Sequence, residues 1–280
     1  MRTQRLSAGP KADGPMRIAA HLGIADPDAP LLAATAGSVD PVAQIYCAAG
    51  LGFAGITDNG LKTRAPEVQR RMGAALRSHG MEMGSFTHNV QGMEPSFFWG
   101  APVADMEMAM SESLAAAERM GGGCINAILL DCGGPQGDQV ARASENLAAA
   151  ARLAGERGVA LAVEAVSRAR VSLALVERVA DVAAVARAAG VGLILDSCHC
   201  HCVGEDMAAA IVAHADILSA VQMADMPDRV QPGAGVIDFA PIIAALRTIG
   251  WRGLVEAELM PKMPGIKEEA EAVAALRALG

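Results

Sequence analysis

Eight short apolar runs alternate along this 280-residue chain with longer segments that have helical periodicity. In those longer segments apolar residues recur at i, i+3, i+4 and i+7, the spacing of one buried helix face. Alternating strands and helices predict parallel strands joined by right-handed crossovers, and eight such units close a barrel. We therefore predict an α/β fold, a single (β/α)8 TIM barrel spanning residues 16–280. The predicted strand runs are RIAAHLG (17–23), FAGITD (53–58), MEMGSFTH (81–88), CINAILLD (124–131), VALAVEAV (159–166), VGLILDS (191–197), ILSAVQMAD (217–225) and GLVEAEL (253–259).

The alternative α/β fold is an open, doubly wound sheet. It favours a glycine-rich phosphate-binding turn after the first strand, but ADPDAPLL follows that strand here. Several predicted helices end in a glycine directly before the next strand, as at Gly80 and Gly190, which is typical of helix C-termini. The clearest helical segments are 66–80, 106–121, 143–158 and 176–190.

Composition narrows the functional class. The net charge is −8 and aromatic residues are 3% of the chain, which disfavours nucleic acid as a partner. The sequence contains no long uncharged apolar stretch, so we do not expect a segment that spans a membrane. Residues 1–15 are basic and polar without the apolar core of a signal peptide, so we expect a disordered N-terminal extension. The six dispersed cysteines are interpreted as reduced thiols of a cytoplasmic protein.

Four polar residues stand near the ends of four successive apolar runs, where an unpaired charge is costly. They are Glu164, Asp196, Gln222 and Glu258, separated by 32, 26 and 36 residues. Each interval is close to one strand–helix unit, so we expect all four side chains at one level of the barrel mouth. Three carboxylates and an amide oxygen favour Mg²⁺ or Mn²⁺ as cofactor. The alternative for Glu164 is an ion pair with Arg168 or Arg170.

A metal in such a site polarises a carbonyl and holds the adjacent hydroxyl. A carboxylate beside it can remove the proton between the two oxygens, and a second can return it.

The C-terminal half resembles the hydroxypyruvate isomerase family of the xylose isomerase-like barrel superfamily. The resembling stretches are VEAVS (163–167), LDSCH (195–199), VQMADMPDRVQPGAGVIDF (221–239) and GWRGLVEAEL (250–259). The resemblance implies that Glu164, Asp196, Gln222 and Glu258 bind the metal and that Glu164 and Glu258 are the catalytic acid/base pair. It also implies that His199 and Arg229 contact substrate oxygens. Related ketose 3-epimerases usually carry His where Gln222 stands.

The N-terminal half resembles the family less closely. FTHN (86–89) is similar to the end of the family's third strand, which implies that His88 and Asn89 line the substrate pocket. His21 either faces the pocket or is a satisfied core histidine. Thr57 occupies the usual position of a Glu. We expect these positions to determine the substrate.

The motif CHCHC (198–202) also invites a metal-site interpretation. As an extended segment it would place its three cysteines on one side and its two histidines on the other. A structural zinc site needs four ligands, and no second ligand pair is nearby, so we favour a thiol-rich loop around His199.

The leading hypothesis is an isomerase of the aldose–ketose or hydroxypyruvate type that acts on a small keto sugar or keto acid. The alternatives are a ketose 3-epimerase, a keto-glycoside lyase or hydratase, and a sugar-binding barrel without activity. An endonuclease acting on abasic sites would need added histidine ligands and a basic groove, which are not evident. The family implies a homo-oligomer, a dimer or tetramer.

Overall fold

The chain forms a parallel β-barrel surrounded by helices, and the computed structural model describes residues 14–88 and 102–280. The strands are β1 (Arg17–His21), β2 (Gly55–Thr57), β3 (Glu82–Met83), β4 (Ser85–Thr87), β5 (Cys124–Ala127), β6 (Ala160–Glu164), β7 (Gly192–Asp196), β8 (Leu218–Met223) and β9 (Leu254–Ala257). The helices are α1 (Ala33–Ala36), α2 (Pro41–Gly50), α3 (Pro66–His79), α5 (Met106–Met120), α6 (Gln136–Glu156), α7 (Val179–Ala189), α8 (Ser197–Cys202), α9 (Met207–Ala213), α10 (Ala240–Thr248) and α11 (Ile266–Arg277), with short 3₁₀ turns at Leu61–Thr63 and Val103–Asp105.

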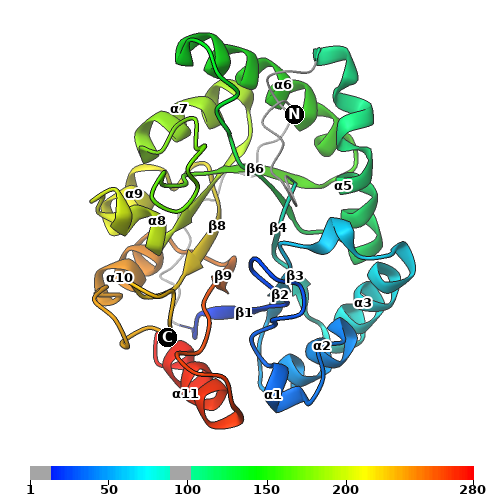
Figure 1. Cartoon of the computed structure of the whole chain (residues 1–280), viewed down its shortest axis with the longest axis vertical. Coiled ribbons are helices and arrows are strands. Elements are labelled where there is room, and N and C mark those ends of the chain that lie inside the picture. The colour runs from blue at the N-terminus through cyan, green and yellow to red at the C-terminus, as the bar shows by residue number, and fades with distance from the viewer. Residues whose placement is uncertain (1–13, 89–101) are drawn as a thin grey trace.

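The strand order closes the barrel. It runs β3-β2-β1-β9-β8-β7-β6-β5-β4, with every pairing parallel. β3 and β4 are separated only by Gly84, whose N–H donates to Ile56 O and whose carbonyl accepts from Cys124 N. They are therefore two halves of the third predicted strand, each paired with a different neighbour. Figure 1 looks down this ring, with the strands inside and the helices outside. The predicted eight-unit barrel is confirmed.

A small apolar cluster fills the barrel interior. It consists of Cys124, Ala162, Ile194 and Ala220, one from each of β5 to β8, and is separate from the main core. Side chains two positions along a strand lie on the same face, so Glu164, Asp196 and Gln222 also point inward, one step nearer the carboxyl ends. The small cluster thus forms the floor beneath the predicted site.

The outer ring of helices is closed by a contact between α1 and α11. α11 packs against α1, and the Glu269 carboxylate on α11 accepts hydrogen bonds from Ala34 N and Thr35 N at the start of α1. Figure 1 shows these two helices side by side below the barrel.

One predicted helix begins earlier than expected. The helix predicted from residue 143 is α6, which begins at Gln136, directly after Pro135. Proline is compatible with a helix N-terminus, so it can stand immediately before this helix.

The CHCHC motif is helical and forms neither an extended segment nor a loop, so the expected thiol-rich loop is wrong. It lies within α8, whose N-terminus is capped by Asp196: its carboxylate Oδ1 accepts from Cys198 N at 2.6 Å and His199 N at 3.0 Å. Capping by the preceding residue overrides the alternating pattern, because it satisfies amides that a helix start leaves unpaired. All six cysteines are free thiols.

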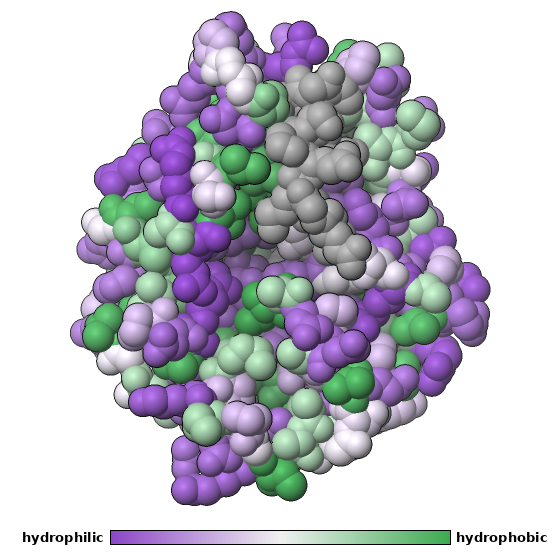
Figure 2. Space-filling view, viewed as in Figure 1, coloured by the Kyte–Doolittle hydropathy of each residue, from purple (hydrophilic) through white to green (hydrophobic). Residues whose placement is uncertain are grey.

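In the described part of the chain, no helix has the length and hydropathy needed to span a membrane. Figure 2 shows hydrophilic and hydrophobic residues intermingled over this face of the molecule. The expected N-terminal extension of 1–15 lies, except for residues 14 and 15, outside the described residues.

Candidate metal and substrate site

A cavity of about 410 Å³ opens at the carboxyl ends of the strands. Four of the residues predicted from the sequence line it: Glu164, His199, Arg229 and Glu258. Loop residues after β1 and β2 form another part of the wall, including Gly23 and Asn59. The cavity therefore lies where barrel enzymes carry their active sites.

The four predicted metal ligands come together at this mouth, but not all at one level. β7 and β8 pair Asp196 with Gln222, as the sequence spacing predicts. The direct partner of Gln222 on β9 is Glu256, while Glu258 lies two residues further toward the mouth. Side chains at both levels reach the site because the strands of a barrel are staggered.

The site holds more negative than positive charge. Glu164, Asp196 and Glu258 are all buried, and the charged partner of Asp196 and Glu258 within the described structure is Arg229. Burial, followed by the charges of Glu258 and Asp196, raises the pKa of Glu164 well above its ordinary value. Burial and Asp196 also raise the pKa of Glu258, against the opposing effect of Arg229. Such a cluster is stabilised by a bound cation.

The donor set fits a hard divalent cation. Gln222 is 2% exposed, and its Oε1 receives no hydrogen bond in the described part of the chain. A buried carbonyl without a donor is rare in native structures, so it indicates a missing ligand. Atoms of Glu164, Asp196 and His199 also lie within 4.8 Å of one another, close enough to hold a metal ion. Carboxylate and amide oxygens are the ligands that Mg²⁺ and Mn²⁺ prefer.

His199 lies between the predicted acid Glu164 and Arg229. Burial, reinforced by Arg229, lowers the pKa of its ring to about 4, so the imidazole is neutral at pH 7. Its Nδ1 accepts the backbone N–H of Ser167 at 3.1 Å. Its Nε2 lies 3.6 Å from Glu164 Oε1 and 3.4 Å from Arg229 Nη2, which can only donate. His199 therefore presents Nε2 beside both a carboxylate and a cation at the cavity.

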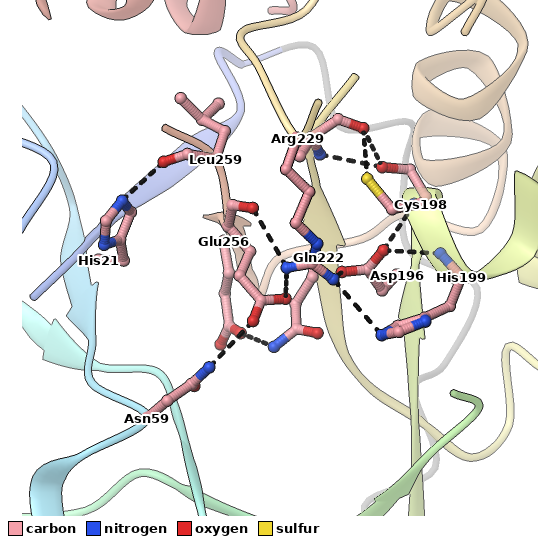
Figure 3. Close-up of polar contacts among 12 residues, drawn as sticks. His21, Asn59, Asp196, Cys198, His199, Gln222, Arg229, Glu256 and Leu259 are labelled. Carbon is pink, nitrogen blue, oxygen red and sulfur yellow. Dashed lines mark hydrogen bonds and ion pairs between the residues drawn. The ribbon is translucent and has the colours of Figure 1, made fainter. Parts of the chain in front are cut away.

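Arg229 is the central cation of the site. Its Nη2 donates to Asp196 Oδ2 at 2.7 Å, and its Nη1 lies 3.0 Å from Glu258 Oε2. Although burial alone would lower the pKa of Arg229, Asp196 and Glu258 raise it above its ordinary value. Figure 3 shows Asp196, His199, Gln222 and Arg229 converging. The guanidinium thus links two predicted ligands across the mouth.

A buried carboxylate shapes the loop that carries Arg229. Asp225, which is 0% exposed, accepts four backbone N–H groups: those of Met226 and Ile237 at Oδ1, and those of Gly233 and Gly235 at Oδ2. Arg229 itself has φ 54°, a conformation that costs a non-glycine residue roughly 1 kcal/mol or more. The loop holds Arg229 in this conformation. Asp225 therefore orders the loop, whereas the side chain of Asp228 is exposed.

Two asparagines contact the predicted acid/base pair and were not identified from the sequence. Asn126 Nδ2 donates to Glu164 Oε2 at 2.5 Å, and Asn59 Nδ2 donates to Glu258 Oε1 at 2.9 Å. Asn126 could have been identified from the sequence, because it is a polar residue inside the apolar run CINAILLD. Arg168 pairs with Glu177 at 2.9 Å, so the alternative ion pair with Glu164 is not formed by Arg168.

Of the substrate contacts predicted in the first half of the barrel, His21 and His88 do not line this cavity in the described part of the chain. His21 donates from Nε2 to Leu259 O at 2.6 Å and is 1% exposed; Figure 3 shows this hydrogen bond. His88 is also 1% exposed, and its Nδ1 lies 2.8 Å from Ser113 Oγ on α5. Both side chains are buried and have polar partners. Asn89 lies outside the described residues.

Comparisons with known proteins agree with this architecture. The family model described as xylose isomerase-like TIM barrel matches residues 45–279. A search of curated protein sequences gives no significant match.

Several solved structures share the fold at low sequence identity. A 3-keto-D-glucoside 4-epimerase from E. coli is 18% identical with a TM-score of 0.74, covering 94% of this chain and 99% of that chain. A family 2 AP endonuclease from Brucella melitensis is 20% identical with a TM-score of 0.70, covering 92% and 96%. An L-ribulose 3-epimerase is 22% identical with a TM-score of 0.69, covering 92% and 86%.

Proposed function

Because the chain belongs to the xylose isomerase-like TIM barrel family, we propose that it is a divalent-metal-dependent isomerase acting on a small keto sugar or keto acid. The observation that carries the proposal is the pair Glu164 and Glu258. Both are buried at the carboxyl ends of strands, both line one cavity, and both have a raised pKa. Carboxyl groups with raised pKa values are suited to exchange protons near neutral pH.

The proposed reaction is a proton transfer between two adjacent carbons. One glutamate removes the proton from the carbon that bears the hydroxyl next to the carbonyl, and the C–H electron pair becomes the double bond of an enediolate. The hydroxyl proton passes to the former carbonyl oxygen, and a proton delivered to the former carbonyl carbon turns the enediolate into the isomer with its new carbonyl group, so atoms and electrons balance. Asn126 and Asn59 hold the two carboxylates by hydrogen bonds while the proton moves.

Glu164, Asp196, Gln222 and Glu258 are proposed to hold Mg²⁺ or Mn²⁺. The ion would supply Lewis-acid stabilisation of the negative charge that develops on the substrate oxygens. The excess buried negative charge and the unpaired Gln222 carbonyl support this assignment.

His199 and Arg229 are proposed to orient the substrate. The neutral His199 ring offers its Nε2 without charge, whereas Arg229 offers N–H donors at the cavity wall. Both lie beside Glu164 or Glu258, so a substrate oxygen bound to them would lie near a proton acceptor.

A second candidate is an epimerase, which returns the proton to the same carbon on the opposite face. The likeness to a 4-epimerase and a 3-epimerase favours it, and it uses the same residues. Cleavage of nucleic acid is less well supported, because the net charge is −8 and His199 is the one histidine on the cavity wall in the described structure.

The test is proton exchange in D₂O. The protein would be incubated with Mn²⁺ or Mg²⁺ and with hydroxypyruvate or small ketoses, and followed by NMR. We expect deuterium at a carbon next to the carbonyl; an aldehyde product indicates the isomerase, and an inverted hydroxyl with no aldehyde indicates the epimerase. Glu164→Gln and Glu258→Gln should each slow exchange by about 10²–10⁴-fold, because each removes a proton carrier.

Glu269→Gln is the matched control, since Glu269 is also a buried glutamate that accepts backbone N–H groups but caps α1 on the outer ring. It should retain full exchange. Absence of exchange with every substrate would contradict the proposal, and a fully active Glu258→Gln variant that binds sugar would favour a different role for the pair.

A further inference from the structure

A further buried glutamate lies beneath the predicted metal site and outside the predicted ligand set. Glu256 on β9 is 2% exposed and is the direct register partner of Gln222 on β8. It forms no ion pair within the described structure. A carboxyl group kept inside a barrel without a cation destabilises the fold, so its presence needs another explanation.

Every contact of Glu256 is an accepted hydrogen bond. Its Oε1 accepts from Ser85 N at 2.7 Å, and its Oε2 accepts from Ser85 Oγ at 2.5 Å and from Gln222 Nε2 at 3.3 Å. Gln222 Nε2 also donates to Ser85 Oγ at 3.2 Å. Both oxygens of Glu256 thus lie against donors, and the Gln222 amide turns its nitrogen toward Glu256.

The backbone leaves space for this carboxylate at the break between β3 and β4. A Cβ atom on Gly84 would lie 2.6 Å from Glu256 Oε1 and 2.9 Å from Thr57 Cγ2. The missing side chain at Gly84 is thus what admits Glu256 next to Ser85. Gly84, Ser85, Gln222 and Glu256 thus form one connected group.

With its nitrogen held by Glu256, the Gln222 amide has its oxygen on the other side. That oxygen is buried and has no donor within the described structure. Gln222 is also the register partner of Asp196, whose carboxylate is bound by Arg229 at the mouth. We propose that Glu256 is a positioning residue that fixes the Gln222 amide with its oxygen toward the bound divalent cation. This proposal rests on the metal site of the proposed function.

A purely structural role predicts a different result. If Glu256 only filled space, its replacement by the isosteric glutamine would remove a buried charge and leave metal affinity unchanged. If it positions Gln222, the same change places an amide beside an amide. The amide nitrogen introduced at position 256 can then donate to the Gln222 oxygen, so Gln222 turns its nitrogen toward the cation.

The experiment measures Mn²⁺ affinity of the metal-stripped full chain by calorimetry or by the EPR signal of free Mn²⁺. Glu256→Gln should weaken Mn²⁺ binding by about 10–100-fold, the usual cost of losing a group that orients a ligand. The double variant Gln222→Glu with Glu256→Gln should restore wild-type affinity or exceed it, because the amide introduced at position 256 then donates to a carboxylate that presents oxygen in either orientation. Glu269→Gln, a buried glutamate on α11, should bind as the wild type does.

The outcomes separate this inference from the metal site itself. A wild-type chain that binds no Mn²⁺ overturns both. Wild-type binding with unchanged affinity in folded Glu256→Gln overturns the positioning role alone, as does a double variant that binds no better than Glu256→Gln. If Glu256→Gln does not fold, Glu256→Asp withdraws the carboxylate from Gln222, and unchanged affinity in that variant contradicts the proposal.

Discussion

At the scale of single residues, the barrel interior repeatedly pairs a buried carboxyl group with a side-chain amide. The pairs are Glu164 with Asn126, Glu258 with Asn59 and Glu256 with Gln222. An amide N–H stabilises a carboxylate without neutralising it. The negative charge that attracts a cation is therefore retained. The sequence indicated the charges, because Glu and Asp are conspicuous in apolar runs, but an asparagine gives a weaker signal.

His21 gives a residue-level prediction about pH. Burial lowers the pKa of His21 to about 4, against an ordinary value of 6.5. Between these values the unfolded chain binds more protons, so the free energy of unfolding falls as the pH drops through this window. His21→Gln keeps a donor for Leu259 O but removes this pH-dependent contribution to the free energy of unfolding. Wild-type stability should fall by about 2.5 kcal/mol more than that of the variant between pH 7.5 and 4.5.

Urea denaturation of both proteins across this pH range measures the difference. Parallel stability curves would show that His21 is not buried in its neutral form.

At the scale of elements, strand ends were predictable and the details of loops were not. The spacing of the apolar runs placed Glu164, Asp196 and Gln222 on neighbouring strands. Because side-chain direction along a strand has a period of two, it also placed them on one face. The six-residue helix α8 was missed, since its formation depends on capping by Asp196 rather than on an apolar face. The role of Glu256 was missed for a similar reason. The segment VEAEL places Glu256 on the same face as Glu258, but its partner Ser85 comes from across the barrel.

The loop after β8 gives an element-level prediction. Asp225→Asn turns one acceptor oxygen into an NH₂ group that faces backbone N–H donors, so two hydrogen bonds are lost in a buried position. We expect the free energy of unfolding to fall by about 3 kcal/mol. Release of Arg229 from its φ 54° conformation should also lower kcat/KM.

Urea denaturation and steady-state kinetics measure both effects. Asp228→Asn alters an exposed aspartate of the same loop and should change neither quantity. If Asp225→Asn lowers stability but leaves kcat/KM intact, the loop does not control Arg229.

At the scale of the whole molecule, the barrel followed from the count of strand–helix units, because eight parallel strands have one simple way to close. The position of the closure did not follow. It depends on Gly84, where one strand divides into β3 and β4 to serve two neighbours. His21 and His88, at the ends of the first strands, are buried with polar partners, an environment that periodicity alone does not predict for a side chain at a strand end.

Metal binding gives a whole-molecule prediction. A ligand that binds only the folded state at 100 times its Kd adds about 2.7 kcal/mol to stability. For a domain of this size we expect saturating Mn²⁺ to raise Tm by about 5–10 °C over the protein in EDTA. Glu164→Gln should abolish the rise, because it removes a charged ligand from the cluster, whereas Glu269→Gln should keep it. Thermal unfolding followed by circular dichroism measures both; a rise retained in Glu164→Gln would contradict the ligand assignment.

The contact between the first and last parts of the barrel has a consequence for synthesis. β1 pairs with β9, Arg17 opposite Leu254, so one edge of β1 has no strand beside it until the ribosome has passed residue 254. Such an edge can pair with strands of other molecules. The nascent chain therefore carries an open edge while the residues between these two strands are synthesised, and the barrel closes only after them.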